Sequence, residues 1–222
     1  MLIACWSVKG GAGTTVVSVS LALVLARSHP GGVLVADLAG DVPAALGVAD
    51  PRDPGLAAWL AAGSSVPADA LARLELDAGA GLSLLPRGTG PLPAGDRVEV
   101  LAGLLAADPR PAVADCGVLD ATSPGLAVAA AATSSLLVTR ACYLALRRAA
   151  MAPVRPSGVV LVREPGRALG RDEVETVVGA PVLAEVAVDP AVARSVDAGM
   201  LASRLPRALD RALRTLVPPL AA

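Results

Sequence analysis

Short, uniformly apolar runs of strand length alternate with helical segments along most of this 222-residue chain. Strands that are apolar on both faces belong inside a parallel sheet that helices cover on both sides. With right-handed crossovers, the alternation predicts an α/β fold: one domain over residues 1–222, built on a doubly wound, mostly parallel sheet in three layers. The expected strands are 2–8, 33–37, 82–85, 112–115, 136–139, 158–163 and 182–186. The expected helices are 14–27, 55–62, 96–107, 123–132, 143–152, 171–178, 190–198 and 206–217.

The stretch 63–93 interrupts this alternation, because it is rich in Gly, Pro and Ala. Such a composition favours turns and loops over regular elements. We expect it to form surface excursions around the single strand at 82–85.

Hydrophobic residues make up 54% of the chain, which raises the question of a membrane protein. The most apolar stretch, 126–138, is interrupted by Thr133, Ser134 and Ser135, so it is interpreted as a buried helix that leads into a buried strand. Met1 leads directly into a strand, without a basic segment or a cleavage site that would indicate export. A cytoplasmic location is expected, with a polar site or the inner face of the membrane as the alternatives.

The charged residues and the cysteines indicate little chemistry of their own. The formal net charge is −1, which gives no overall attraction to nucleic acid. The arginines between positions 147 and 171 are interpreted as a solvated face, and DNA binding is not expected. The three cysteines lack the spacing of a metal site and are interpreted as small core residues in a reducing compartment.

A glycine-rich run links the first expected strand to the first expected helix, and it reads Lys9-Gly10-Gly11-Ala12-Gly13-Thr14-Thr15. Such a turn directs backbone N–H groups and the positive end of the helix dipole at one point, which binds phosphate. Thr15 offers a hydroxyl where P-loops hold Mg²⁺. The segment Gly10 to Thr15 is therefore a candidate nucleotide-binding loop, and the alternative is a glycine-rich turn that binds nothing.

The loop lacks the lysine that an ordinary P-loop carries before its final Ser or Thr, because Thr14 occupies that position. Such a lysine contributes a charge-assisted contact to a polyphosphate worth about 1.5 to 3 kcal/mol. It also stabilises the charge of the transition state of phosphoryl transfer. We therefore expect nucleotide binding to survive and hydrolysis to be weak or absent.

Two aspartates end expected strands at the edge where open α/β sheets bind their ligands. Asp37 ends the second expected strand, and Asp115 ends the fourth. Both are candidate Mg²⁺ ligands together with Thr15. Capping of the following turn is an almost equal alternative for Asp37, whereas the metal-side role is favoured for Asp115.

The run KGGAGTT resembles the deviant Walker A motif KGGxGK[ST] of the MinD/ParA family of P-loop ATPases. Its ending, Gly-Thr-Thr, is similar to that of the CpaE/TadZ-like pilus-assembly localisation proteins. The resemblance implies a P-loop NTPase fold that binds ATP or ADP with Mg²⁺. It further implies that Lys9 reaches the phosphates across a nucleotide-sandwich homodimer and that Asp115 is the Walker B acid, both in catalytic positions. Lys9 as a plain surface residue remains the alternative.

This chain departs from the family pattern at four positions, Thr14, Ala39, Gly117 and Val162. Ala39 replaces an acid that helps to position the attacking water in ATPase relatives, and Asp41 compensates only if the loop shifts by two residues. Gly117 replaces a usual proline, and Val162 an asparagine that often reads adenine. Each of the four departures weakens the case for an efficient ATPase, and Val162 also puts base specificity in doubt.

Two segments are candidates for contacts with partners. The segment 205–217 has an apolar side opposite its arginines and is expected to dock on its own sheet, while membrane association is the less favoured alternative. The segment 143–148 belongs either to a dimer or partner face, or to the core through Tyr143, Leu144 and Leu146.

The resemblance implies a positioning protein with nucleotide-dependent dimerisation or docking in a pilus, secretion or septum-positioning assembly. An active ATPase of chromosome partition or septum-site placement, and a scaffold with an empty loop, are the alternatives.

Overall fold

The computed structural model of the chain describes residues 1–49, 51, 54–63 and 66–217. Its centre is an eight-stranded sheet with the order β3-β4-β2-β5-β1-β6-β7-β8. All neighbouring strands pair in parallel except β3, which runs antiparallel to β4 at one edge. The strands are β1 (Leu2–Ser7), β2 (Val33–Asp37), β3 (Leu76–Gly79), β4 (Leu82–Leu85), β5 (Ala112–Val118), β6 (Ser134–Arg140), β7 (Gly158–Arg163) and β8 (Val182–Ala187).

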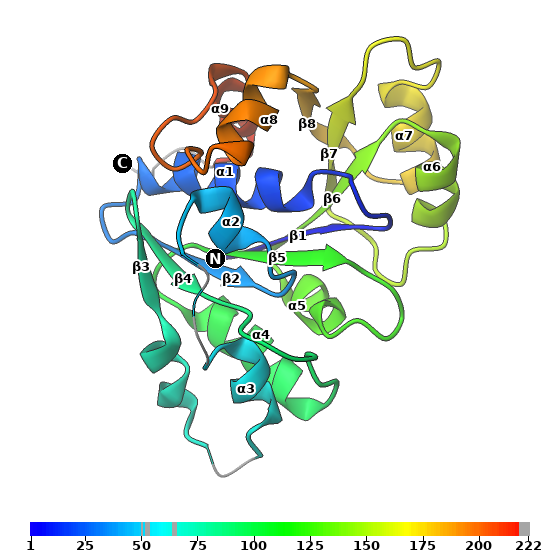
Figure 1. Cartoon of the computed structure of the whole chain (residues 1–222). Helices are drawn as coiled ribbons and strands as arrows, with labels where there is room; N and C mark the ends of the chain where they lie inside the picture. Colours follow the sequence, from blue (N-terminus) through cyan, green and yellow to red (C-terminus); the bar gives the residue numbers. More distant parts are fainter. Residues whose placement is uncertain (50, 52–53, 64–65, 218–222) are drawn as a thin grey trace.

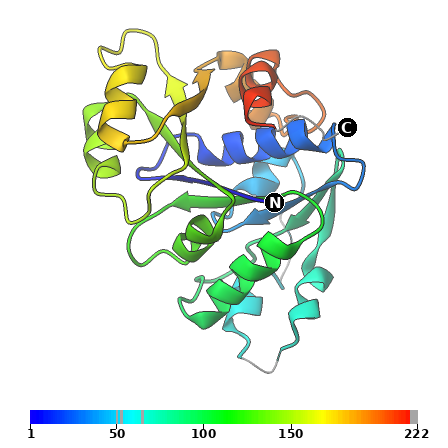
Figure 2. The same ribbon diagram turned by 180° about the vertical axis from the view of Figure 1, so that it is seen from behind.

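Helices cover both faces of the sheet, as Figures 1 and 2 show from opposite sides. One apolar core lies between the sheet and α3 (Leu56–Ala61), α4 (Asp96–Ala107), α5 (Gly125–Ala131), α6 (Tyr143–Ala149) and α7 (Arg171–Val178). The other lies between the sheet and α1 (Thr14–Ala26), α2 (Val42–Leu46), α8 (Pro190–Asp197) and α9 (Arg207–Leu213). The central strands β1 and β2 are buried along their whole length, which is why their sequences are apolar up to the last residue of each, Ser7 and Asp37. The predicted three-layer, mostly parallel α/β fold is confirmed.

The prediction for residues 63–93 was wrong in one respect, because this stretch contributes two strands to the sheet. β3 and β4 form a hairpin whose turn places Ala80 at φ 52° between Gly79 and Gly81, which also have positive φ. Three of the four residues of β3 are exposed, so its sequence carries no apolar run. The guanidinium of Arg110 fixes this edge by pairing with Glu75 and with Asp108.

The predicted amphipathic segment near the C-terminus docks on the domain. Leu209 and Leu213 are buried in the second core, and α9 packs against α1 and β8. The stretch 126–138 forms nearly all of α5 and most of β6, so it is a helix that leads into a strand, as the sequence predicted. In the part of the chain that the structure describes, no helix combines the length and apolarity needed to cross a bilayer.

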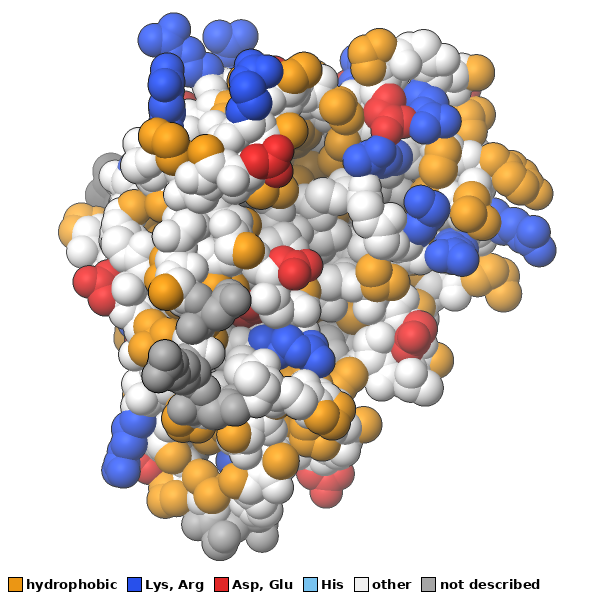
Figure 3. Space-filling model, viewed as in Figure 1, with side chains coloured by type: hydrophobic (Ala, Val, Ile, Leu, Met, Phe, Trp, Pro, Cys, Tyr) orange, Lys and Arg blue, Asp and Glu red, His pale blue; other side chains and the backbone are white. Residues whose placement is uncertain are grey.

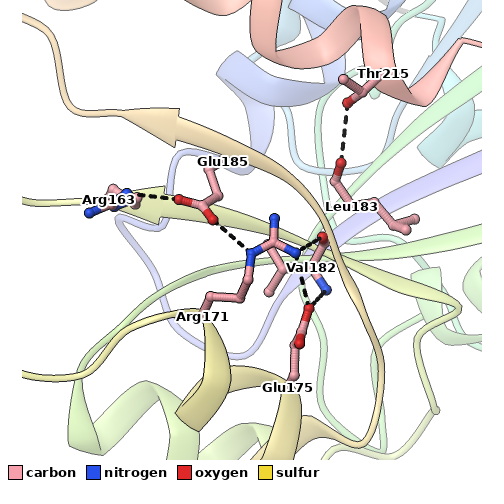
Figure 4. A network of polar contacts seen from close by, with 7 residues as sticks. All are labelled: Arg163, Arg171, Glu175, Val182, Leu183, Glu185 and Thr215. Atoms are coloured by element: carbon pink, nitrogen blue, oxygen red, sulfur yellow. Dashed lines mark hydrogen bonds and ion pairs between the residues drawn. The ribbon is translucent and has the colours of Figure 1, made fainter.

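An ion-pair network joins β7, α7 and β8 at the other edge of the sheet (Figure 4). Glu185 accepts from Arg163 and Arg171, and Arg171 also pairs with Glu175. The Glu175 carboxylate in turn accepts from the backbone N–H of Val182 at the start of β8. These arginines are exposed and serve to hold the surface of this edge together, which agrees with their interpretation as a solvated face.

Candidate functional site

The glycine loop joins the carboxyl end of β1 to the first turn of α1. Gly11 and Gly13 have φ of 74° and 90°, a left-handed conformation that residues with a Cβ rarely adopt. Gly13 is also the N-cap of α1, and it offers no side chain to the free amides of the first turn. No acidic residue lies in that turn, so the positive end of the helix is uncompensated. The loop therefore presents free N–H groups suited to an anion.

A pocket of about 480 Å³ lies over this loop. Its volume falls within the range of sites for small ligands. A Cβ built on Gly10, Gly11 or Gly13 would meet no heavy atom within 4 Å, so the space above the loop is open. The pocket is lined by Ser7, Gly10, Gly11, Gly13, Thr14, Thr15, Val16, Leu38, Ala39, Asp41, Arg87, Cys116, Gly117 and Val118. Most of the predicted phosphate-binding residues are thus brought together, with the exception of Lys9 and Ala12.

Asp37 and Asp115 lie side by side next to this pocket, because β2 and β5 pair with these two residues in register. Both are fully buried. The carboxylate of Asp37 accepts from the backbone N–H of Gly40 at 2.6 Å and of Val42 at 3.3 Å. These bonds support the capping role for Asp37, and its role as a metal ligand stays a prediction.

Asp115 is held differently, since only one of its carboxylate oxygens has a partner. Oδ1 accepts from the N–H of Gly117 at 3.2 Å. Oδ2 is buried without a hydrogen-bond partner among the described residues. Burying a carboxylate oxygen without a hydrogen-bond donor costs free energy, so a proton on this oxygen or a bound cation would stabilise the site.

Burial raises the pKa of both carboxyl groups. The pKa of Asp115 is raised to about 6, despite the opposing effect of the Thr15 hydroxyl and the Gly117 amide. The pKa of Asp37 is raised to about 7 by burial, and the charges of Asp115 and Asp41 add to that effect. The pair therefore holds protons close to neutral pH, and a bound cation would release them.

Three of the departures from the family pattern line the pocket, namely Thr14, Ala39 and Gly117. A Cβ added to Gly117 would lie 3.2 Å from the Cβ of Ala39, so these two substituted positions contact each other. Gly117 has φ 63°, which a proline cannot adopt, so the backbone near the end of β5 follows a path closed to the usual family residue.

Lys9 lies on the opposite side of the loop. It lines a cleft of only about 20 Å³ with Val138, Thr139, Arg140 and Cys142 at the end of β6. Its ammonium group makes no hydrogen bond or ion pair with any residue that the structure describes. Within one copy of the chain, Lys9 therefore does not complete the phosphate pocket.

The remaining sequence candidates divide between the core and the surface. Val162 is 8% exposed and packs in the second core, so it offers no polar group to a base. Tyr143 is 74% exposed and Leu144 43% exposed, whereas Leu146 is buried. The core interpretation of Tyr143 and Leu144 was therefore wrong. Cys5 and Cys116 are buried, and burial raises the pKa of the Cys5 thiol to about 12.

Sequence reasoning missed Arg87, which lines the pocket from the end of β4. The residue stands alone in a Gly- and Pro-rich stretch, and no local motif marks it. Only the strand order, which places β4 beside β2, carries it to the site.

The sequence profile of the CobQ/CobB/MinD/ParA nucleotide binding domain matches residues 3–202. The chain belongs to this family. No curated protein sequence matches the chain significantly.

Solved structures of MinD and ParA proteins share the fold at low sequence identity. A ParA family ATPase from Chlorobium tepidum TLS is 20% identical, with 97% of each chain covered and a TM-score of 0.79. The septum site-determining protein MinD from Pyrococcus horikoshii OT3, complexed with Mg-ADP, is 19% identical, covering 97% of this chain and 93% of its own, with a TM-score of 0.77. A chain of the MinC:MinD cell division protein complex from Aquifex aeolicus is 18% identical, covering 100% and 98%, with a TM-score of 0.75. This likeness establishes the P-loop NTPase fold of ParA and MinD proteins.

The residues of this CobQ/CobB/MinD/ParA domain fit a magnesium ion that arrives with phosphates. Among the described residues, no three His, Cys, Asp or Glu side chains are grouped to hold a metal by themselves. Mg²⁺ usually takes one or two protein oxygens and completes its shell with phosphates and water. The Thr15 hydroxyl in the pocket and the unpartnered Oδ2 of the neighbouring Asp115 are suitable oxygens. When bound, such an ion neutralises phosphate charge.

Proposed function

We propose that this protein binds ATP and ADP with Mg²⁺ as a positioning protein of CpaE/TadZ type in the cytoplasm. The observation that carries the proposal is the open 480 Å³ pocket over a glycine loop that opens α1, beside a buried carboxylate oxygen without a partner. In a loaded site, the loop amides would hold the phosphates, the Thr15 hydroxyl and Asp115 would hold the metal, and Asp115 would release its proton to solvent when the cation binds. The Mg-ADP in the MinD from Pyrococcus horikoshii supports this assignment.

Hydrolysis in this protein is weak or absent. Thr14 provides no charge for the transferring phosphate, and Ala39 provides no acid to orient water. Nucleotide binding, rather than hydrolysis, then controls the behaviour of the protein. Purified protein is expected to bind Mg-ATP and to release phosphate slowly, whereas rapid, Lys9-dependent hydrolysis by clean protein would contradict the proposal.

Nucleotide occupancy controls self-association or docking on a partner protein. Lys9 is unpaired within the described part of one copy and lies beside the exposed Tyr143 and Leu144 region at the end of β6. A second copy brings its own loop to this side, and Lys9 then contacts phosphates across the interface. The partners belong to a pilus, secretion or septum-positioning assembly, in keeping with the MinC:MinD complex of the Aquifex aeolicus relative.

The alternative function is an active ATPase in chromosome partition or septum-site placement. One observation favours it: Asp41 lines the pocket, close to the place of the acid that Ala39 lacks. A turnover assay with Thr14→Lys separates the two functions. A large gain in turnover supports a site that binds without efficient hydrolysis, and little gain supports a working ATPase.

Nucleotide titration with a mass readout of oligomeric state tests the proposal. Isothermal titration with ATP, ADP and GTP, each with Mg²⁺, is expected to show binding of adenine nucleotides and a shift from monomer to dimer with ATP. Absence of heat with all three nucleotides would reject nucleotide binding and leave a scaffold with an empty loop.

A further inference from the structure

The phosphate pocket contains a single basic side chain among its described lining residues, and that residue is Arg87. It follows β4, which lies beside β2 on the far side of β2 from the loop strand β1. The side chain nevertheless lines the same pocket as Thr14 and Thr15. The guanidinium of Arg87 therefore reaches the pocket from the β2 side, opposite the loop.

The Arg87 side chain lies across the segment that follows β2. Its Nη1 donates to the carbonyl of Leu38 at 2.5 Å, and its Nη2 donates to the carbonyl of Gly90 at 3.4 Å. Its Cδ lies 3.0 Å from the position that a Cβ on Gly40 would occupy. Close packing on Gly40, which has φ 103°, is thus part of how the side chain reaches the pocket.

The guanidinium of Arg87 is not paired with any described carboxylate, unlike the guanidinium groups of the half-buried Arg110 and Arg140. Arg110 pairs with Glu75 and Asp108, and Arg140 pairs with Glu164. Arg97 lies over the ring of Trp59, 4.0 Å from its centroid. Among the described residues, Arg87 donates hydrogen bonds to two neutral carbonyls, which leave several of its five N–H groups available.

The surroundings of the pocket increase the need for such a charge. Asp41 lines the pocket, and Asp37 and Asp115 lie buried beside it. These carboxylates attract a metal ion but repel a polyphosphate. Charged side chains are sparse in the middle of the face drawn in Figure 3, whereas Lys and Arg gather at its upper corners. A single guanidinium is therefore the dominant local cation for an anion on the loop.

We propose that Arg87 contacts the phosphate oxygens of the bound nucleotide and supplies the positive charge that the loop lacks at Thr14. A planar guanidinium with free N–H groups suits two phosphate oxygens at once. Its bond to the Leu38 carbonyl ties the same contact to the segment 38–41, so phosphate binding orders the wall that carries Ala39 and Asp41. This inference rests on the proposed nucleotide binding and names the residue that makes it possible without the usual lysine.

Isothermal titration of Mg-ATP into matched arginine variants tests this role. Arg87→Gln is expected to lower the affinity for Mg-ATP about ten- to hundredfold, as the loss of a charge-assisted contact does. Arg87→Lys keeps the charge without the fork and is expected to retain part of the affinity. The control, Arg73→Gln, removes an exposed arginine that pairs with Asp69 far from the pocket and is expected to leave the affinity unchanged within twofold.

A second variant distinguishes a phosphate contact from a general structural role. Installing Thr14→Lys in the Arg87→Gln background is expected to restore most of the lost affinity, and to raise it by a larger factor than in the native background. If Thr14→Lys raised the affinity for Mg-ATP by the same factor in both backgrounds, positions 14 and 87 would not contribute interchangeable charge to the phosphates. The unfolding temperatures of the ligand-free variants establish that each is folded.

The outcomes separate the two proposals. If the native protein binds no nucleotide, the proposed function fails. If the native protein binds Mg-ATP and Arg87→Gln binds it equally well within twofold, only the role of Arg87 is overturned.

Discussion

The two sides of the glycine loop differ in what they can hold. On the β5 and β2 side, a pocket of about 480 Å³ is lined by loop glycines, two threonines, Asp41 and Arg87. On the β6 side, Lys9 lines a cleft of about 20 Å³, enough for little more than one water molecule. The first side is large enough to bind a phosphate chain within one copy of the protein. The second side could contact a ligand only if another surface covered it.

This difference suggests two separable tasks for one motif under the proposed function. In that function, the amides and hydroxyls of residues 10–15 bind nucleotide within one chain, and Lys9, which lines the other side of the loop, makes contacts between chains. Thr14 in place of a lysine weakens the first task and leaves the second intact. The predictions below alter one side at a time.

The largest effect is expected from Thr14→Lys on the pocket side. A lysine here regains the contact worth about 1.5 to 3 kcal/mol, so affinity for Mg-ATP rises about ten- to hundredfold. Isothermal titration measures the change, and phosphate release measures any gain in turnover. Arg147→Lys, an exposed position on α6, is the control for added lysine. An unchanged affinity would mean that phosphates do not lie near position 14.

Asp115→Asn is expected to change how stability depends on pH. The folded pKa of Asp115, about 6, lies above its unfolded value of 3.8, so its contribution to stability is present below about pH 4 and is lost as pH rises through 6. The amide avoids burying a charge, so the variant is more stable than the native protein by about 2 to 3 kcal/mol at pH 8 and equally stable at pH 4. Urea unfolding at both values measures the difference.

Two further measurements sharpen the Asp115 prediction. Asp197→Asn, an exposed carboxylate at the end of α8, is the control and is expected to change stability by less than about 0.5 kcal/mol at either pH. The same Asp115 variant is expected to weaken the dependence of nucleotide affinity on Mg²⁺. A loss of stability at pH 8 would contradict the account of the unpartnered Oδ2.

A glycine pair tests the loop that both sides share. Gly13→Ala places a Cβ at φ 90° and is expected to lower the free energy of unfolding by about 1 to 2 kcal/mol. At Gly10 the added Cβ would meet open space and the backbone φ is not positive, so Gly10→Ala is expected to lower the free energy of unfolding by less than about 0.5 kcal/mol. Equal losses for the two variants would mean that the left-handed turn does not define this loop.

The smallest effect on binding within one copy is expected from Lys9→Ala. Because Lys9 faces the β6 cleft, affinity for Mg-ATP measured at low protein concentration changes less than about threefold, or about 0.6 kcal/mol. The ATP-dependent increase in mass at high protein concentration is expected to disappear. A loss of monomer affinity as large as that of Arg87→Gln would reverse the assignment of the two sides.

Much of the fold was predictable because the central strands are buried on both faces, and this burial appears in the sequence as short apolar runs. The loop was predictable because only glycine adopts the φ of Gly11 and Gly13 without strain. The edge strand β3 was not, since an exposed strand that contains Asp77 and Gly79 has no apolar run. The short helix α2 was not predicted either, because its five residues are too few to show a helical period and it depends on contacts with α1 and α8.

The functional site was predictable only where its residues are neighbours in sequence. Gly10 to Thr15 act as one motif, and Asp115 ends an apolar run. Arg87 reaches the pocket through the placement of β4 next to β2, and the exposure of Tyr143 depends on where the end of β6 lies. The position of Arg87 and the exposure of Tyr143 depend on strand order and tertiary packing, which cannot be derived from a single sequence.

The backbones of Gly47 and Gly199 touch: a Cβ on Gly47 would lie 1.9 Å from the carbonyl oxygen of Gly199. No side chain lies between them, so no change of rotamer can absorb a displacement at this point. The end of α2 and the turn after α8 therefore act as a rigid joint. Residues 38–41 of the pocket wall lead directly into α2, so this backbone contact joins that wall to the turn after α8 on the same face of the sheet.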